Sequence, residues 1–409
     1  MDPLSSARSD DNDLCHESPR KTKRITSSSG KAVGPRCREP RAHSKIRRRP
    51  AASAASDCSR RAVTVGTDFA GTDTPIISLH NTGFLVRHVF TTESNKSCRR
   101  LSELVTSPQC EIRHNDIRDR SVQPVPTVDL YVAGVPCWTW CTGGKQEGLG
   151  DKRGAGKLWV NVLEYVENRK PKAVVLECAP TLVTQKKFAK VKDAILDGIA
   201  SCGYDVHHSL LRTDDHGVPQ TRVRFYDVAL KVSVKRRQFS FPPALPNTVP
   251  LDSIIIGPKV KTLRNMLPTH EREKQHVLHA LKQASAMNVD FNTCRIIVDI
   301  GASEQFGHYT FNKFPTITAS RGSRLEFWIA DLGRKVTLNE LLMLQGFDPR
   351  KVDFDAANIS WQRAGHMIGN AMSCNVLDRL LPRVLDSIGI EPAKPVQDRW
   401  HFIASQLAA

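Results

Sequence analysis

Residues 128–137, VDLYVAGVPC, decide the fold of this chain, because a nearly continuous apolar run ends there in Pro136 and Cys137. A short run of this kind is typical of a strand buried on both faces, as in a parallel sheet covered by helices. Open α/β sheets place reacting groups on loops just past the carboxyl ends of their strands, so Cys137 is a candidate nucleophile. The competing interpretation is a small, buried, apolar cysteine, which is the usual state of a free thiol.

Composition narrows the class of protein. The 409 residues, 40% of them hydrophobic, are enough for a large core and about two or three domains. The formal net charge of +17 favours a polyanionic partner such as nucleic acid, although solubility or a basic tail would also account for it. The 11 cysteines form no CxxC pair or zinc-finger spacing, so we expect reduced thiols and no metal. No apolar stretch approaches the roughly 20 residues of a membrane span, and no secretory signal is recognisable, so we expect an intracellular protein without membrane contact.

Residues 1–60 are rich in Ser, Arg, Lys and Pro and poor in large apolar side chains, which predicts a disordered basic tail. Two basic clusters lie within it, PRKTKR at residues 19–24 and KIRRRP at residues 45–50. Such clusters are typical of nuclear-import or nucleic-acid-binding segments, which favours a location in the nucleus. A solvated tail without such a role is the alternative.

From residue 61 onward, strands and helices alternate. Strands are predicted near residues 63–68, 86–90, 110–115, 128–135, 173–176, 205–211 and 224–230, with helices at 98–105, 157–168 and 188–202. This order predicts an α/β fold with a doubly wound, mostly parallel, Rossmann-like sheet. We expect residues 61–231 to form its first part, residues 232–312 a small second domain, residues 313–390 a segment that returns to the first domain, and residues 391–409 a tail. Further helices are predicted at 271–286, 338–344 and 371–385.

Small or acidic residues follow the first three predicted strands. Phe69, Ala70 and Gly71 form a turn through which the backbone can approach a ligand closely. Glu93 follows the second strand, where a carboxylate can accept hydrogen bonds from ribose hydroxyls. Asp116 follows the third strand, where it can accept one from an adenine amino group. Together they predict a nucleoside at the carboxyl edge of the sheet.

With these residues in place, the segment 63–385 resembles the cytosine-C5 DNA methyltransferase family. The resemblance rests on short motifs that occur in the family's order and at close to its spacing. They are Phe69-Ala70-Gly71, Glu93, Asp116, Gly134-Val135-Pro136-Cys137, Glu177, GVPQTRVR at residues 217–224, LQGF at residues 344–347 and Gly369-Asn370-Ala371. The resemblance implies a class I methyltransferase domain with a small target-recognition domain, S-adenosylmethionine as cofactor, no metal, and double-stranded DNA as partner. It gives no sign of an obligate protein partner.

The resemblance also implies a catalytic role for four residues. Cys137 supplies the thiolate that adds to C6 of cytosine, and Glu177 binds N3 of the ring. Arg222 and Arg224 neutralise the carboxylate or orient the base and its phosphate. The implied cofactor contacts are Phe69, Ala70, Gly71, Glu93, Asp116, Ile117, Pro136 and Asn370.

The implied contacts with DNA are five further residues. Because a cytosine cannot be reached inside a duplex, it must flip out, and Gln220 is expected beside the rotated nucleotide. Trp138 has a flat side chain that could stack on bases. Lys235, Arg236 and Arg237 are expected to meet phosphate at the entrance to residues 232–312, the part that would choose the target sequence.

Two segments depart from the family's pattern. Thr72-Asp73-Thr74 stands where the family has further glycines, and Asp73 is expected to bind the amino group of the cofactor's methionine part. Trp138-Thr139-Trp140-Cys141 follows Cys137. Trp140 either stacks on DNA bases or packs in the core. Cys141 is a second candidate for the nucleophile or for a proton shuttle.

Two other functions stay open. The first is a tRNA cytosine-C5 methyltransferase built on the same scaffold with the same catalytic residues. The second is a catalytically silent DNA-binding regulator of methylation. The two loops that depart from the family's pattern favour this alternative.

Overall fold

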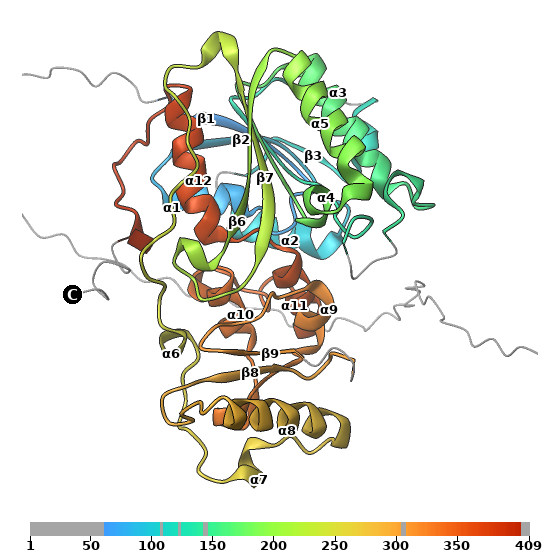
Figure 1. Cartoon of the computed structure of the whole chain (residues 1–409). Helices are drawn as coiled ribbons and strands as arrows, with labels where there is room; N and C mark the ends of the chain where they lie inside the picture. The colour runs from blue at the N-terminus through green and yellow to red at the C-terminus, as the bar shows by residue number, and fades with distance from the viewer. Residues whose placement is uncertain (1–60, 107–108, 122–123, 142–145, 304–307, 402–409) are drawn as a thin grey trace, which may run out of the picture. The chain divides into compact units, whose positions relative to one another are not determined.

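A seven-stranded sheet forms the centre of the larger part of the chain (Figure 1). The computed structural model describes residues 61–401 except 107–108, 122–123, 142–145 and 304–307. The predicted tail of residues 1–60, with both of its basic clusters, lies outside the described residues. Within the part that the structure describes, no helix is long and apolar enough to cross a membrane.

The strand order of this sheet is β3-β2-β1-β4-β5-β7-β6. The first five strands are parallel to their neighbours, and β7 runs antiparallel to both β5 and β6. The prediction of a doubly wound, mostly parallel sheet is therefore confirmed. The strands are β1 (Val63–Asp68), β2 (Val86–Thr92), β3 (Ile112–His114), β4 (Leu130–Gly134), β5 (Ala173–Cys178), β6 (Tyr204–Arg212) and β7 (Val223–Lys231).

Alternating side chains of β4 serve two separate cores, which explains its continuous apolar sequence. Leu130 and Val132 pack with α1 (Thr74–Asn81) and α12 (Cys374–Ser387) on one face. Tyr131 and Ala133 pack with α3 (Leu158–Arg169) and α5 (Ala189–Ser201) on the other. Figure 1 shows these helices covering both faces of the sheet. Two further helices of this part are α2 (Lys96–Val105) and α4 (Thr181–Thr184).

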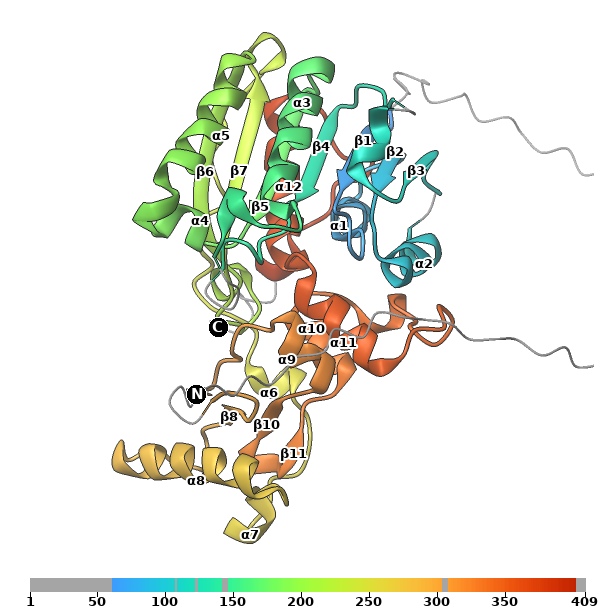
Figure 2. The same ribbon diagram turned by 90° about the vertical axis from the view of Figure 1, so that its right-hand side faces the viewer.

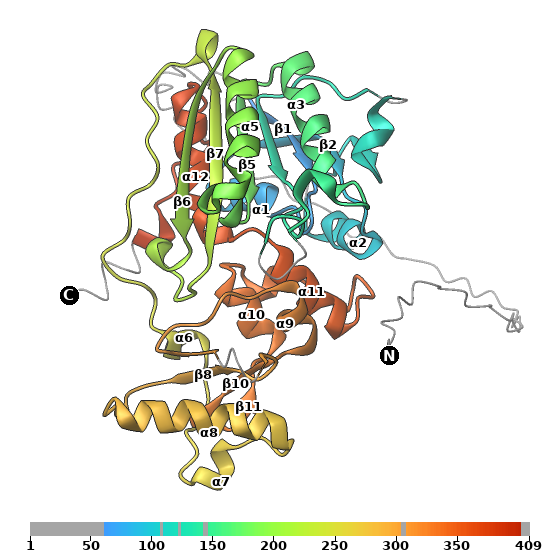
Figure 3. The ribbon, with the colours of Figure 1, turned by 45° about the vertical axis from the view of Figure 1, so that its right-hand side comes forward.

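A second sheet has the order β11-β10-β8-β9 and is antiparallel. Its strands are β8 (Ile296–Asp299), β9 (His308–Phe311), β10 (Phe327–Ile329) and β11 (Arg334–Lys335). Helix α8 (Glu271–Ala286) packs Val277 and Leu281 against this sheet. Figure 3 shows the helix lying alongside the strands. The predicted boundary at residue 312 divides the sheet, because β10 and β11 come after it. The remaining helices are α6 (Leu251–Ile254), α7 (Leu263–Met266), α9 (Ala319–Arg324), α10 (Leu338–Leu344) and α11 (Trp361–Asn370).

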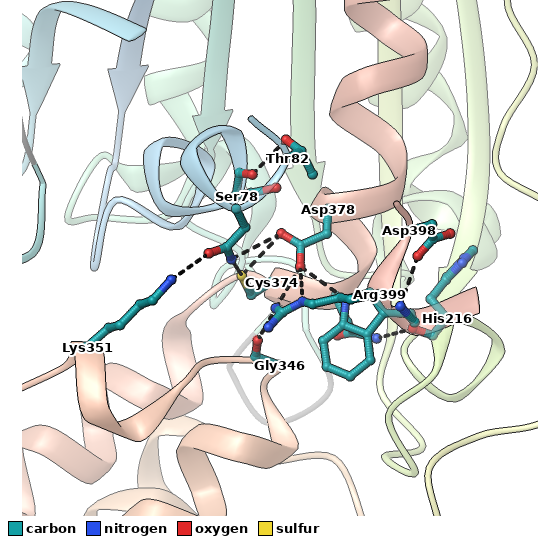
Figure 4. A network of polar contacts seen from close by, with 12 residues as sticks. Ser78, Thr82, His216, Gly346, Lys351, Cys374, Asp378, Asp398 and Arg399 are labelled. Atoms are coloured by element: carbon teal, nitrogen blue, oxygen red, sulfur yellow. Dashed lines mark hydrogen bonds and ion pairs between the residues drawn. The ribbon is translucent and has the colours of Figure 1, made fainter. Parts of the chain in front are cut away.

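Residues 398–400, in the predicted tail, are anchored to α12 by buried polar contacts (Figure 4). The Asp378 carboxylate accepts hydrogen bonds from Arg399 Nη2 at 2.7 Å and from the Trp400 indole at 3.0 Å. Arg399 also donates to the carbonyl of Gly346 at 2.9 Å, and the Trp400 side chain packs against Val218. This part of the tail therefore closes over the loops that lead into β7 and α12.

We expect Trp400→Ala to lower the free energy of unfolding by about 3 kcal/mol, because it removes a buried aromatic ring and a donor to Asp378. Chemical denaturation followed by fluorescence measures the change. Trp361→Ala is the matched control, since that side chain is 48% exposed, and it should cost less than about 1 kcal/mol. Equal costs for the two variants would contradict an anchored tail.

Candidate functional site

The residues predicted for catalysis lie at one edge of the large sheet, where β4 and β5 end and β7 begins. Cys137 lies three residues beyond the end of β4. Glu177 pairs in register with Gly134 of β4 on one side and with Tyr226 of β7 on the other. Because β7 is antiparallel, Arg224 near its start lies at this same edge (Figure 2). Three strands therefore bring Cys137, Glu177 and Arg224 together.

The surroundings of Cys137 act on its thiol in opposite directions. Burial raises the pKa of Cys137, the nearby Arg224 guanidinium lowers it, and the Glu177 carboxylate raises it further. The net direction is upward, so the thiol is protonated at neutral pH in the protein alone. A substrate or a base that withdraws the proton is then needed to form the thiolate.

Glu177 and Arg224 form a partly buried ion pair. Arg224 Nε lies 3.2 Å from Glu177 Oε1, and the two side chains are 16% and 11% exposed. Within the described part of the chain, no donor makes a hydrogen bond of good geometry with that oxygen. This oxygen is buried and is held by the charge of Arg224 rather than by a well-aligned hydrogen bond.

Arg222 lies close enough to Cys137 and Glu177 to act on them electrostatically, but its hydrogen bonds run to the backbone, and its contact with the base stays a prediction. Its guanidinium is buried and donates to the backbone carbonyls of Ile317 at 2.8 Å, Gly369 at 3.1 Å and Ala371 at 2.8 Å. Burial lowers the pKa of Arg222 to about 9, so the side chain stays charged at neutral pH. Arg222 therefore fastens the returning segment to the start of β7.

The loop after Cys137 begins with a single hydrogen-bonded turn. The backbone N–H of Cys141 donates to the carbonyl of Cys137 at 3.0 Å. Trp140 is fully buried and meets Phe188 edge to face at 5.1 Å, so the core interpretation is confirmed. Trp138 is partly exposed and lies under the guanidinium of Arg153 at 3.5 Å from the ring centre.

The turn after β1 has a backbone conformation and an open space that could receive a ligand. Phe69 and Gly71 have φ of 51° and 56°, in the left-handed region. A Cβ added to Gly71 would meet no atom within 4 Å, so the space above it is open. Glu93 lies beside it, and its two oxygens accept from the N–H groups of Gly71 at 2.8 Å and Asn95 at 2.7 Å. Burial raises the pKa of Glu93, and these two hydrogen bonds oppose the rise.

The other predicted cofactor residues vary in how they are placed. Pro136 is partly exposed beside Cys137, and Ile117 is buried next to the end of β3. The carboxylate of Asp116 binds Arg118, which lowers the pKa of Asp116. Asn370 ends α11 with an exposed side chain, 3.4 Å from His366 Nδ1. The open space at Gly71 and the acceptors Glu93 and Asp116 fit a nucleoside with an attached amino acid; Asp116 would have to share its carboxylate with Arg118.

Gln220 differs from its prediction, because its side chain is completely buried. Its amide donates to the carbonyl of Leu344 at 2.6 Å and accepts from the N–H of Ile317 at 3.2 Å. These contacts leave no face of the amide toward a nucleotide. Gln220 joins the β7 entrance to the segment around Gln345.

Lys235, Arg236 and Arg237 lie away from the candidate site. They follow the end of β7, and Leu230 near that end pairs with Ala173, the first residue of β5. Lys235 pairs with Asp205, and Arg237 pairs with Asp386. Because β7 is antiparallel, its last residues reach the amino edge of the sheet. These three cations therefore lie at the opposite edge of the sheet from Cys137, and their contact with phosphate at the entrance to residues 232–312 stays a prediction.

Sequence reasoning also misplaced Asp73 and missed a buried cluster around Asp68. The Asp73 side chain is fully buried and bonded to the hydroxyls of Thr67 and Ser102, so it offers nothing to a ligand's amino group. Asp68, the last residue of β1, accepts from Tyr131 Oη and from Arg120. The signal that could have found these contacts is weak, since each polar residue alone is also common on a surface.

Comparisons with known proteins agree with this geometry. The family model of C-5 cytosine-specific DNA methylases matches residues 68–385. Type II methyltransferase M.HaeII of Haemophilus aegyptius is 26% identical over 314 residues, which cover 77% of this chain and 91% of that protein. Type II methyltransferase M.NgoBI of Neisseria gonorrhoeae is 28% identical over 295 residues, covering 71% and 84%. The solved structure of the Entamoeba histolytica methyltransferase EhMeth has a TM-score of 0.53 at 14% identity, over 80% of this chain and 98% of that one, which supports the fold alone. Both sequence relatives are bacterial, so they lend no support to a nuclear location.

We expect alkylation of Cys137 by iodoacetamide to speed up as pH rises, because only the thiolate reacts and its pKa is raised. Arg224→Gln should move this pH curve upward by roughly one unit, and Glu177→Gln should move it downward. Mass spectrometry of the peptide that contains Cys137 measures the rate, with the peptide that contains the buried Cys374 as internal reference. Shifts of the same sign in both variants would contradict the assigned charges.

We expect Arg222→Lys to lower the free energy of unfolding by about 3 kcal/mol, because one ammonium group cannot bind three divergent carbonyls. Thermal unfolding measures the loss. Arg224→Lys is the matched control two residues away, and its effect on stability should stay below about 1 kcal/mol, since that side chain is partly exposed. A larger cost at Arg224 than at Arg222 would refute this division.

Proposed function

The chain belongs to the family of C-5 cytosine-specific DNA methylases and is a DNA cytosine-5-methyltransferase, and from this premise we propose how it acts. It transfers the methyl group of S-adenosylmethionine to C5 of a flipped-out cytosine in double-stranded DNA. Cys137 forms a transient covalent bond to the base, and no metal takes part.

One observation carries the proposal: Cys137, Glu177 and Arg224 converge at a sheet edge that also holds the open turn at Gly71. Addition to a cytosine ring requires a thiol, a carboxyl group that can pass a proton to N3, and a guanidinium that holds this group in place. The neighbouring acceptors at Glu93 and Asp116 suit ribose and adenine. The two groups of residues lie on adjacent strands, which supports transfer between a nucleoside cofactor and a base.

The chain's own residues divide the chemistry as follows. Cys137 Sγ adds to C6 of the cytosine and makes C5 nucleophilic. Glu177 hydrogen-bonds to or protonates N3, through a proton held between its carboxyl group and the ring, which keeps charge from building up on the ring, and Arg224 holds Glu177 in place. S-adenosylmethionine supplies the electrophilic methyl group when bound. A base then takes the proton from C5, the electrons of that C–H bond restore the C5–C6 double bond, Cys137 leaves C6 as a thiolate, and a proton from solvent restores the thiol.

Trp138 is the side chain proposed to meet DNA bases, because it is partly exposed beside Cys137, with Arg153 stacked on its ring. The described contacts of Gln220, and of Lys235 and Arg237, are with other parts of the chain, so these residues carry no part of this proposal. The net charge of +17 is consistent with a polyanionic substrate. The part of the chain around the second sheet is the candidate for choosing the target sequence.

We expect the purified protein to transfer labelled methyl groups from S-adenosylmethionine to duplex DNA. Cys137→Ser should abolish the transfer, by more than about a thousandfold, because an alcohol is a far weaker nucleophile toward C6. Cys141→Ser is the matched control one turn away and should keep most of the activity.

Two outcomes would contradict this proposal. An active Cys137→Ser enzyme with a silent Cys141→Ser enzyme would move the nucleophile to Cys141. Label on tRNA and none on DNA would replace the substrate. Bisulfite sequencing of DNA from cells that express the chain reports both the activity and its sequence context.

A further inference from the structure

Asp73 is an unusual residue for the turn between β1 and α1. Its backbone is left-handed, with φ of 53° and ψ of 40°, and its side chain is fully buried. A residue with a Cβ loses about 1 kcal/mol or more in this conformation, whereas glycine does not. The side chain must therefore contribute something that a glycine cannot.

The Asp73 carboxylate connects three elements beneath the turn. One oxygen accepts from the hydroxyl of Thr67 in β1 at 2.9 Å, and the other accepts from the hydroxyl of Ser102 in α2. The Thr67 oxygen also lies 3.0 Å from Nε2 of His88 in β2. Burial lowers the pKa of His88, so this imidazole is neutral and the carboxylate is satisfied by neutral donors. Figure 2 shows α1 and α2 near the ends of these strands.

Hydrogen bonds of its backbone N–H groups also hold the same turn in place. The N–H of Asp73 donates to the carbonyl of Ala70 at 2.8 Å, and the N–H of Ala70 donates to the carbonyl of Thr92 at 3.1 Å. The N–H of Gly71 donates to Glu93 at 2.8 Å. The turn is thus held at both ends, while the space above Gly71 is open.

We propose that Asp73 is a positioning residue that sets the affinity for the adenosyl cofactor. This inference rests on the proposed function, in which the turn from Phe69 to Gly71 contacts the cofactor. Asp73 does not touch the ligand; it holds the Gly71 and Glu93 contacts in the conformation that receives it. A turn that is already ordered does not lose backbone entropy when the ligand binds, which strengthens binding. The role concerns cofactor binding and leaves the chemical step unchanged.

Asp73→Asn tests the proposal, because an amide of the same shape cannot accept from both hydroxyls. Calorimetric titration with S-adenosylhomocysteine, the demethylated product, should show binding weakened by at least about tenfold. In the methylation assay KM for S-adenosylmethionine should rise by a similar factor. At saturating cofactor, kcat and KM for DNA should stay within about twofold of the native values.

Two further variants complete this test, one as a control and one as a second probe of the same hydrogen bonds. Glu103→Gln removes an exposed carboxylate one residue after Ser102 and should leave cofactor affinity unchanged. Ser102→Ala removes one of the two donors and should weaken binding by about threefold to fivefold, and it carries the test if Asp73→Asn does not fold.

The outcomes distinguish the inference from the proposed function. An affinity within about twofold of the native value in Asp73→Asn, with or without a lower melting temperature, would overturn the role of Asp73. A fall in kcat at saturating cofactor with unchanged affinity would overturn it as well. Failure of the native protein itself to bind S-adenosylhomocysteine would refute the proposed cofactor, and with it the inference.

Discussion

The buried guanidinium of Arg222 is the constraint on which the arrangement of the site depends. A charge in the interior costs several kcal/mol unless polar groups compensate it, and three backbone carbonyls converge on the two Nη atoms of Arg222. Two of them belong to Ile317 and Gly369, which lie 95 and 147 residues further along the chain. The guanidinium therefore holds α11 and the segment before α9 against the entrance of β7. At Gly134, the last residue of β4, an added Cβ would come within 2.9 Å of Met372, which fits the same close approach of the returning segment.

Two arginines that look equivalent in the sequence have different roles in the structure. Arg222 and Arg224 are two residues apart, and strand alternation predicts that they share one face. The strand begins only at Val223, so the pleat does not govern the direction of Arg222. Arg222 turns inward to the carbonyls, while Arg224 stays at the edge and pairs with Glu177. A motif tells which residue types are present, but it does not tell which way each side chain points. The buried side chain of Gln220 is a second example, because its direction could not be predicted from the motif either.

The elements of the large sheet were predictable, whereas the strands of the second sheet were not. The continuous apolar run of β4 and the helical patterns of α8 and α10 predicted these elements within a few residues. The strands of the second sheet are two to four residues long, too short for a period to show. The position of Lys235–Arg237 could not be predicted for a different reason: the antiparallel direction of β7 carries the residues after it to the far edge of the sheet, and no local pattern signals strand direction.

Asp73 shows how a turn can be ordered by side-chain hydrogen bonds in place of glycine flexibility. Its two hydroxyl donors come from β1 and α2, so any shift between these elements would leave a buried carboxylate short of a donor. Such a loss costs about 1–3 kcal/mol, more than the strain of the left-handed backbone. Glu93 makes the same connection between the turn and the end of β2 through Gly71. The turn is thus tied to the packing of three elements, and its conformation follows from the fold around it whether or not a ligand is bound.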